Sequence, residues 1–301
     1  MPSIKRAFDY ILHNRAQFMD SCVKNLGFMI PDKQYLQLRF RFNMGYWPNF
    51  KNPKTFNEKL NWLKLYNRKP LYTKMVDKHA VKKLVSDLIG PEYIIPTIGI
   101  WDTPEHIDWE FLPDQFVLKT THGGGSCGVV VCSDKNTFNK VETINKLKES
   151  MQSDIYAELR EWPYKNVEKK VIAESFLDTG GKDLNDYKFF CFNGKVRCFK
   201  VDFGRFVEHH ANYFAPNGSL LPFGEKVCTP DSMHEVSLPE NLHEMISIAE
   251  RIAKGHLFLR VDLYNVNGKV YFGETTFFPA GGMGQFTDTA WDEKLGDWIQ
   301  L

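Results

Sequence analysis

The chain has 301 residues, of which 43% are hydrophobic and 14% aromatic, which is enough apolar material for a substantial core and for one or two domains. It carries 38 basic and 37 acidic residues, so its formal net charge is only +1. This near-balance argues against a nucleic-acid-binding protein, which normally shows a basic surplus or a clustered basic face. Any site that binds a polyanion must therefore depend on a small group of basic residues and not on the net charge of the chain.

Residues 1–20 lack the apolar core of a signal peptide, and no uncharged apolar stretch approaches the roughly 18 residues that suggest a membrane span. We therefore expect a cytoplasmic protein without a membrane span, with peripheral membrane association left open. The six cysteines form no Cys-x-x-Cys pair, so we expect reduced, mostly buried thiols and no zinc. His209 and His210 have no third ligand at useful spacing, so no metal site is expected there.

The first third of the chain predicts helices. Thr55 and Glu58 have the spacing of a capping box, which would start a helix through Phe56. The segment Lys74–Leu88 predicts a second, amphipathic helix, with its apolar residues on one face and Lys78 elsewhere. Taken alone, Lys78 would be a solvated lysine.

A glycine-rich loop follows between two expected strands, in the segments Ile94–Asp102 and Gln115–Val131. One apolar run ends in Lys119, and the loop contains Gly123, Gly124, Gly125 and Ser126. Glycines let backbone N–H groups approach a phosphate closely, and a lysine at the strand end adds positive charge. The alternative is a mobile surface loop without a ligand. The pattern is not a P-loop, which needs Gly-Lys-Ser/Thr at the start of a helix.

His122 directly precedes these glycines. Its ring could contact a phosphate or a reaction intermediate, or it could be satisfied by a neighbouring carbonyl group. The segment Thr137–Leu159, further on, predicts a helix.

The remainder is rich in strands. Val171–Phe176 is one strand, and Asp186–Phe192 and Val196–Phe203 form a hairpin joined at Asn193-Gly194. Ser237 with Glu240 has capping-box spacing and predicts a helix through Ile252. Strands with interspersed helices indicate an α+β architecture of sheet and helix layers.

The last expected hairpin, Leu257–Phe278, turns at Asn267-Gly268 and contains Asp262, Glu274 and Thr276. Oxygen ligands of this kind suit Mg²⁺. The alternative is a half-exposed hairpin whose acidic side chains face water.

Whether these oxygens converge depends on the strand register. A two-residue turn would pair Asp262 with Gly273 and separate the two carboxylates. A three-residue loop, with Gly268 as a bulge, would pair Arg260 with Glu274 and bring the acidic groups to one face. We favour the three-residue loop.

The order of these motifs resembles that of the ATP-grasp superfamily. The residues that carry the resemblance are Lys119 with its glycine loop, VIAESFLD at Val171–Asp178, RVD at Arg260–Asp262 and GETTFFPAGG at Gly273–Gly282. A narrower resemblance, to the TupA-like branch, is carried by Asn52–Val81, Asp186–Lys195 and Lys294–Leu301. That branch is associated with teichuronopeptide and other surface-polysaccharide biosynthesis.

The resemblance implies an ATP-grasp fold of the α+β class, in which two α+β lobes clamp a nucleotide. Residues 1–70 would form a helical N-terminal region. Residues 71–168 would form the first lobe with the phosphate loop, and residues 169–301 the second lobe with an adenine hinge and a metal-binding hairpin.

The resemblance also implies roles for residues that bind ATP. Lys78 and Lys119 match two nucleotide lysines, and Glu174 matches the hinge acid. Backbone groups of Ser175, Phe176 and Leu177 would face the adenine, and Asp186 occupies the position of a ribose-binding acid.

Asp262 and Glu274 match magnesium ligands in the same comparison. Thr276 stands where most such ligases have asparagine, which leaves the second metal position open. Arg260 matches an arginine that faces the transferred phosphate, and Lys188 could steady a phosphate or a carboxylate.

The implied activity is an ATP-dependent carboxylate–amine ligase that forms an amide through an acylphosphate and releases ADP and phosphate. The expected cofactors are ATP and Mg²⁺, and the expected partners are a small-molecule or glycan-precursor carboxylate and an amine. Arg260, Lys119, Lys188 and His122 are the expected catalytic residues. The alternatives are a glycosyltransferase, although the chain lacks an Asp-x-Asp motif, and a nucleotide-binding protein without ligase activity.

Overall fold

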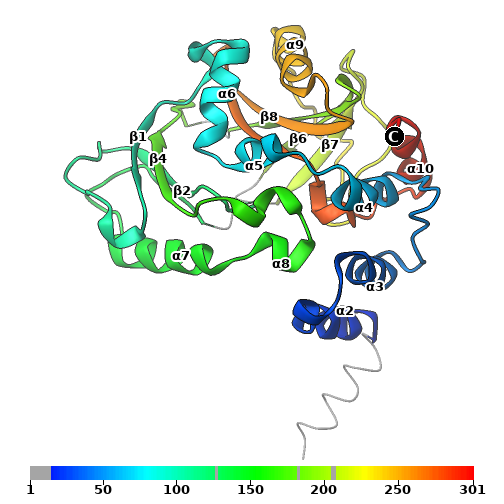
Figure 1. Cartoon of the computed structure of the whole chain (residues 1–301). Helices are drawn as coiled ribbons and strands as arrows, with labels where there is room; N and C mark the ends of the chain where they lie inside the picture. Colours follow the sequence, from blue (N-terminus) through cyan, green and yellow to red (C-terminus); the bar gives the residue numbers. More distant parts are fainter. Residues whose placement is uncertain (1–14, 126–127, 182–183, 205–207) are drawn as a thin grey trace, which may run out of the picture.

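The computed structural model describes residues 15–125, 128–181, 184–204 and 208–301. These residues form two antiparallel sheets, of four and five strands, with helices packed around them (Figure 1). The architecture is α+β, as the mixture of strand and helix patterns predicts.

The smaller sheet has the strand order β1-β4-β2-β3. Its strands are β1 (Thr97–Trp101), β2 (Phe116–Thr120), β3 (Val129–Cys132) and β4 (Val171–Ser175). Phe116, Leu118 and Ala173 are fully buried and pack with Leu147 of α7 (Lys140–Gln152). Because β4 pairs with both β1 and β2, it belongs to this sheet, although a lobe boundary at 168/169 would separate it from them.

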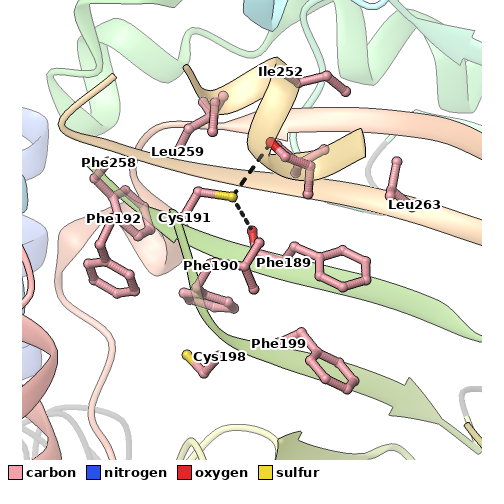
Figure 2. Packing of buried hydrophobic residues seen from close by; sticks show 14 of the residues in the cluster. Phe189, Phe190, Cys191, Phe192, Cys198, Phe199, Ile252, Phe258, Leu259 and Leu263 are labelled. Carbon is pink, nitrogen blue, oxygen red and sulfur yellow. Dashed lines mark hydrogen bonds between the residues drawn. The ribbon is translucent and has the colours of Figure 1, made fainter. Parts of the chain in front are cut away.

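The larger sheet has the order β7-β6-β5-β8-β9. Its strands are β5 (Asp186–Phe192), β6 (Lys195–Phe203), β7 (His210–Phe214), β8 (Phe258–Val266) and β9 (Lys269–Thr276). One face packs on α9 (Leu242–Ala253), where the Cys191 thiol donates to the carbonyl groups of Ala249 and Phe189 at 3.8 Å each (Figure 2).

The other face of β5 changes character along the strand. At one end, Phe192 packs against Phe56 of α4 (Phe56–Tyr66), with ring centroids 5.9 Å apart. At the other end, Lys188 projects from the same side of the strand, because side chains two residues apart share a face. The polar end of this face is where the candidate site lies.

Five of the six cysteines lie in the described part of the chain, and all five are free thiols. Cys132, Cys191, Cys198 and Cys228 are buried, and Cys22 is half-buried. This confirms the expectation of reduced, mostly buried thiols for the described residues. Cys127 lies outside them.

Both Asn-Gly pairs form two-residue hairpin turns. Asn193 and Gly194 have φ angles of 48° and 78°, and they connect the paired residues Phe192 and Lys195. Asn267 and Gly268 behave in the same way, with φ angles of 53° and 81° between Val266 and Lys269. Positive φ at both turn residues is what asparagine and glycine tolerate best. The three-residue loop expected at the second hairpin is therefore wrong.

The two carboxylates of that hairpin nevertheless face each other, because a bulge lies further along it. Leu263 pairs with Phe272, but the next pair is Asp262 with Glu274, so Gly273 is the extra residue. A Cβ atom at position 273 would lie 3.0 Å from the Asp262 carbonyl oxygen, which explains the glycine. A register shift within β9 thus replaces the one expected at the turn.

The N-terminal part is helical, as expected, with α2 (Arg15–Asn25), the 3₁₀ helix η1 (Gly27–Met29), α3 (Asp32–Met44) and α4. The predicted capping box is present at α4: the Thr55 hydroxyl accepts from the Glu58 N–H, and the Glu58 carboxylate accepts from the Thr55 N–H.

The single helix predicted over Lys74–Leu88 is wrong. The segment contains α5 (Pro70–Val76) and α6 (Ala80–Ile89), separated at Asp77. The Asp77 carboxylate accepts from the N–H groups of His79 and Ala80 and so caps α6. The break turns Lys78 toward the glycine loop, where its N–H donates to the Thr121 carbonyl at 3.0 Å.

Two further helix predictions need correction. The segment Thr137–Leu159 is divided into α7 and α8 (Ile155–Leu159), because the Asp154 side chain caps the second helix. Ser237 starts no helix: α9 begins at Leu242 after a turn in which the Leu242 N–H donates to the Pro239 carbonyl. The remaining helices are α10 (Ala290–Asp297), η2 (Pro91–Tyr93), η3 (Pro104–His106), η4 (Trp162–Asn166) and η5 (Pro279–Gly282).

Candidate active site

A buried carboxylate on the smaller sheet lies between two lysines. Glu174 of β4 is 2.6 Å from Lys119 of the neighbouring strand β2 and 2.6 Å from Lys82 of α6. Burial alone would raise the pKa of Glu174, but the two ammonium groups hold it below its ordinary value. The structure therefore brings together the expected phosphate lysine and the expected hinge acid.

Lys82 was not expected in the site. It lies four residues after Lys78, in the first turn of α6, and its ammonium group also donates to the Ile95 carbonyl at 2.6 Å. Burial lowers the pKa of Lys82, and the charge of Lys119 lowers it further. Only the tertiary structure, which brings Lys82 of α6 to Glu174 of β4, could reveal this residue, since a lysine on an amphipathic helix normally faces water.

Lys78 connects the glycine loop to the larger sheet. Its ammonium group donates to the Gly123 carbonyl and lies 3.1 Å from Glu274. The alternative of a solvated lysine does not hold, because the Lys78 side chain is only 10% exposed. Gly124 and Gly125 are exposed, and Gly125 has a φ of 60°. Ser126 lies outside the described residues.

The bulged hairpin carries the second group of charges. The Arg260 guanidinium donates to both carboxylate oxygens of Asp262 at 2.7 Å and lies 3.5 Å from Glu274. Burial raises the pKa of Asp262. The pKa of Glu274 is lowered, because Lys78, Arg260 and Lys188 outweigh its burial. Two carboxylates directly opposite each other on adjacent strands form an oxygen-only donor set that fits Mg²⁺.

Thr276 is two residues beyond Glu274 and opposite Arg260, so it shares the face of the two carboxylates. Thr275 points the other way, where its hydroxyl donates to the Met75 carbonyl at 2.7 Å. The position of Thr276 is thus compatible with the role that the resemblance implies for it.

Lys188 lies in the same row of the sheet, opposite Asp262. Its ammonium group contacts the carboxylates of three strands: Asp186, Asp202 at 3.0 Å and Asp262 at 3.5 Å. Burial would lower the pKa of Lys188, but these carboxylates raise it above its ordinary value. Asp186, expected at the ribose, is here a buried partner of Lys188.

The row continues onto β6 and β7, where sequence analysis missed a further cluster. Lys200 lies opposite Lys188 and Tyr213, and its ammonium group is 3.1 Å from Glu225. The Tyr213 hydroxyl donates to the other oxygen of Glu225 at 2.6 Å. The turn at Asn193-Gly194 does not by itself place Lys188 opposite Lys200, because an irregularity in the pairing of β5 with β6 shifts the register by one residue between the turn and this pair. The turn was therefore not a sufficient signal for this cluster.

Two expected site residues have other contacts. His122 is buried, and its Nε2 lies 3.1 Å from the Ser150 carbonyl of α7, as in the alternative of a loop histidine satisfied by a carbonyl. Burial also lowers the pKa of His122. Ser175, the last residue of β4, and Phe176 and Leu177 after it are half-buried, but the Ser175 N–H already donates to the Pro96 carbonyl at 3.0 Å.

In the folded chain, two possible metal ligands that are not adjacent to it in sequence, Asp202 and Cys228, lie close to His209. Ligand atoms of Asp202, His209 and Cys228 all lie within 4.8 Å of one another, which sequence spacing does not reveal. Asp202 is at the same time an ion-pair partner of Lys188 and Lys200. A cation there would compete with both lysines.

Two antiparallel sheets joined through Lys78, with a glycine-rich loop facing a carboxylate hairpin, define the chain as a protein of the ATP-grasp fold. The family model described as TupA-like ATPgrasp matches residues 58–300, and the chain belongs to that family. Family membership supports an ATP-dependent ligase of the ATP-grasp type.

Several solved ligases are similar to the described structure at low identity. The D-alanine-D-alanine ligase of Helicobacter pylori is 15% identical, with 82% of this chain and 69% of that chain covered and a TM-score of 0.42. The enzyme of Bacillus anthracis is 20% identical, with 75% and 65% covered and a TM-score of 0.42. D-cycloserine synthetase DcsG is 14% identical, with 77% and 72% covered and a TM-score of 0.41.

This chain thus spans about two thirds of the length of the first two ligases. No curated protein matches the chain in sequence. Similarities this distant assign no role to any of its residues.

Proposed function

We propose that the protein is an ATP-dependent carboxylate–amine ligase that acts on a uronic-acid-containing precursor of a cell-surface polysaccharide. The observation that carries the proposal is the row of Glu274, Asp262 and Lys188 across β9, β8 and β5, flanked by Arg260 and Lys78. Cations converging with two carboxylates on one sheet face suit phosphoryl transfer, which depends on positioning and charge neutralisation.

In the proposed reaction, an oxygen of the substrate carboxylate forms a bond to the γ-phosphorus of ATP. The bond from that phosphorus to the β–γ bridging oxygen breaks, and ADP leaves. An amine nitrogen then attacks the acyl carbon of the acylphosphate and loses a proton to solvent, and inorganic phosphate leaves. The products are an amide, ADP and phosphate.

Each part of the cleft has a proposed task in this reaction. Lys119 and Lys82, held by Glu174, would face the nucleotide on the smaller sheet. Lys78 would hold the phosphates between the glycine loop and the hairpin, while Arg260 would neutralise the transferred group, with Lys188 beside it. Asp262 and Glu274 would hold Mg²⁺, which, when bound, supplies positive charge to the phosphate oxygens.

The substrate class comes from the family association with surface polysaccharides and from the acid–amine chemistry of ATP-grasp ligases. A glycosyltransferase would instead need a site for a sugar nucleotide. A nucleotide-binding protein without ligase activity would keep the cleft but would not turn over ATP.

Isothermal calorimetry tests the nucleotide first. We expect Mg·ATP to bind wild-type protein and Lys119→Ala to bind it at least tenfold more weakly, because a charge-assisted hydrogen bond is worth about 1.5–3 kcal/mol. Lys83→Ala is the matched control, since that side chain is 84% exposed on the neighbouring helix. Binding of a Mg·UDP-sugar without binding of ATP would favour the glycosyltransferase.

Turnover is tested separately. ADP release that requires both a uronic acid and an amine supports the ligase. ATP binding without ADP release, over a panel of uronic acids with amino acids and small amines, would favour the non-catalytic alternative.

A further inference from the structure

An exposed apolar surface lies at the N-terminal end of the described chain. Five large apolar side chains of α2, η1 and the turn between them are exposed: Phe18 (39%), Met19 (44%), Leu26 (53%), Phe28 (85%) and Met29 (71%). Phe18, Cys22 and Leu26 are spaced four residues apart and so form one stripe along the helix, which η1 extends. We call these five side chains the apolar patch. It lies at the edge of the molecule, beyond α3 and away from both sheets (Figure 1).

The patch is built on a firmly anchored support. The Asp20 carboxylate of α2 accepts two hydrogen bonds from the Arg39 guanidinium of α3, both at 2.7 Å. The Arg160 guanidinium donates to the Gly27 carbonyl at 2.6 Å and stacks over the Tyr35 ring at 4.0 Å. Two buried arginines therefore fix α2 and η1 to the rest of the protein, while the side chains of the patch remain exposed.

The patch also lies outside the part of the chain that the family shares. The family model begins at residue 58, whereas the patch occupies residues 18–29. The proposed cleft, with Lys78 as its first charged residue, does not include it. The patch therefore lies outside both the matched segment and the residues of the candidate site.

Charge indicates what covers the patch. The exposed charged residues of the segment 15–33 are all basic: Arg15, Lys24 and Lys33. Its two acidic residues, Asp20 and Asp32, are bound by arginines. One acid outside the segment, Glu158, is 2.9 Å from Lys24, in a pair that is about half exposed and so weak.

We propose that the apolar patch docks the protein on an anionic lipid surface. Apolar side chains inserted at the boundary between headgroups and acyl chains, with cations around them, are the features of interfacial membrane binding. A second copy of the chain fits less well, because a two-fold contact would bring the same cations face to face. The proposal does not depend on which reaction the cleft performs.

Co-sedimentation with vesicles tests the proposal on the full-length chain. We expect wild-type protein to bind vesicles containing phosphatidylglycerol and not vesicles of phosphatidylcholine alone. The variant Phe28→Ser/Met29→Ser should bind at least about tenfold more weakly, because full burial of even one such side chain changes affinity by that much. Both side chains are exposed, so the substitutions leave the core intact.

Val227→Ser/Met233→Ser is the matched control, since these apolar side chains are 84% and 91% exposed elsewhere on the chain. It should bind like wild type. Lys33→Glu should weaken binding to phosphatidylglycerol vesicles, and added salt should do the same.

Three results would overturn the proposal. The first is no binding to anionic vesicles, and the second is wild-type binding by Phe28→Ser/Met29→Ser. The third is a doubled mass in light scattering that returns to the monomer value in Phe28→Ser/Met29→Ser, which would identify a second copy as the occupant.

Discussion

The pKa values of charged residues in the candidate site depend on the partners that folding gives them. Glu174 is buried, yet its pKa stays low because Lys82 and Lys119 are both 2.6 Å away. Asp262 and Glu274 face each other on one hairpin, but their pKa values shift in opposite directions. Lys78, 3.1 Å from Glu274, lowers the pKa of that carboxyl, whereas burial and the charges of Asp186 and Glu274 raise the pKa of Asp262. The directions of these pKa shifts are thus set by tertiary contacts.

A residue outside the cleft gives a testable pH dependence. His256 is buried between the rings of Tyr72 and Phe277, and burial together with the charge of Lys69 lowers its pKa to about 4. Its pKa in an unfolded chain is about 6.5. Because the unfolded state binds the proton more tightly, this histidine's contribution to stability is complete above pH 6.5. It declines as the pH falls from 6.5 to 4.

We therefore expect His256→Phe to lose less stability on acidification than wild type. Between pH 6.5 and pH 5, the difference in the change of unfolding free energy should be about 2 kcal/mol. Urea unfolding at both pH values measures it. His243→Phe, at an exposed position, should follow wild type. Equal losses in wild type and His256→Phe would contradict the buried, neutral histidine.

At the scale of elements, single glycines decide how a strand or loop can pack against its neighbours. Gly273 allows the bulge that brings Asp262 opposite Glu274. Gly128 closes the glycine loop against α7: its φ is +73°, and an added Cβ would overlap the Ser150 hydroxyl and lie 2.7 Å from the Thr120 hydroxyl. Gly125 also has a positive φ, but a Cβ there would meet open space.

These two loop glycines make a matched pair. Gly128→Ala should reduce the free energy of unfolding by about 3 kcal/mol, because it combines an unfavourable φ with steric overlap. Gly125→Ala has only the unfavourable φ and should cost about 1 kcal/mol. Chemical denaturation of both variants measures the difference. Equal effects would show that Ser150 does not restrict this position.

Sequence analysis predicted the elements that depend on local chemistry. The Thr55–Glu58 capping box and the positions of the two Asn-Gly turns need only a few neighbouring residues, and all three are as predicted. The loop length expected at Asn267-Gly268 was wrong, because the register shift lies at Gly273 within β9. The break at Asp77 was missed because the apolar spacing of Lys74–Leu88 fits one helix as well as two.

The contacts between distant elements were harder to predict. The ion pair of Lys82 with Glu174 depends on where α6 lies relative to β4 in the folded chain. The ion pair of Lys200 with Glu225 joins β6 to a segment that follows β7. No local pattern encodes either contact. The order of motifs indicated the family, but only the folded chain could show which charges pair.

At the scale of the whole molecule, Lys78 is the charged link between the two sheets. Its N–H and ammonium groups bond to Thr121 and Gly123 of the glycine loop, and its ammonium group contacts Glu274 of the larger sheet.

Among the described residues, no helix combines the length and apolar character that crossing a bilayer requires.

Lys78→Ala should weaken Mg·ATP binding by at least tenfold, since it removes a buried cation from the proposed phosphate position. Lys74→Ala, four residues earlier and exposed, should bind like wild type. Calorimetry measures both affinities. Unchanged affinity in Lys78→Ala would remove this residue from the proposed site.

In the proposed site, the ion pair of Lys78 with Glu274 would also set how two ligands influence each other. A phosphate that attracted Lys78 away from the hairpin would release Glu274 for a divalent cation, and a cation bound to Glu274 would release Lys78 for a phosphate. By thermodynamic reciprocity, each ligand would then raise the affinity for the other by the same factor. Nucleotide and metal would enter this cleft as cooperative ligands, with one internal salt bridge as the coupling between them.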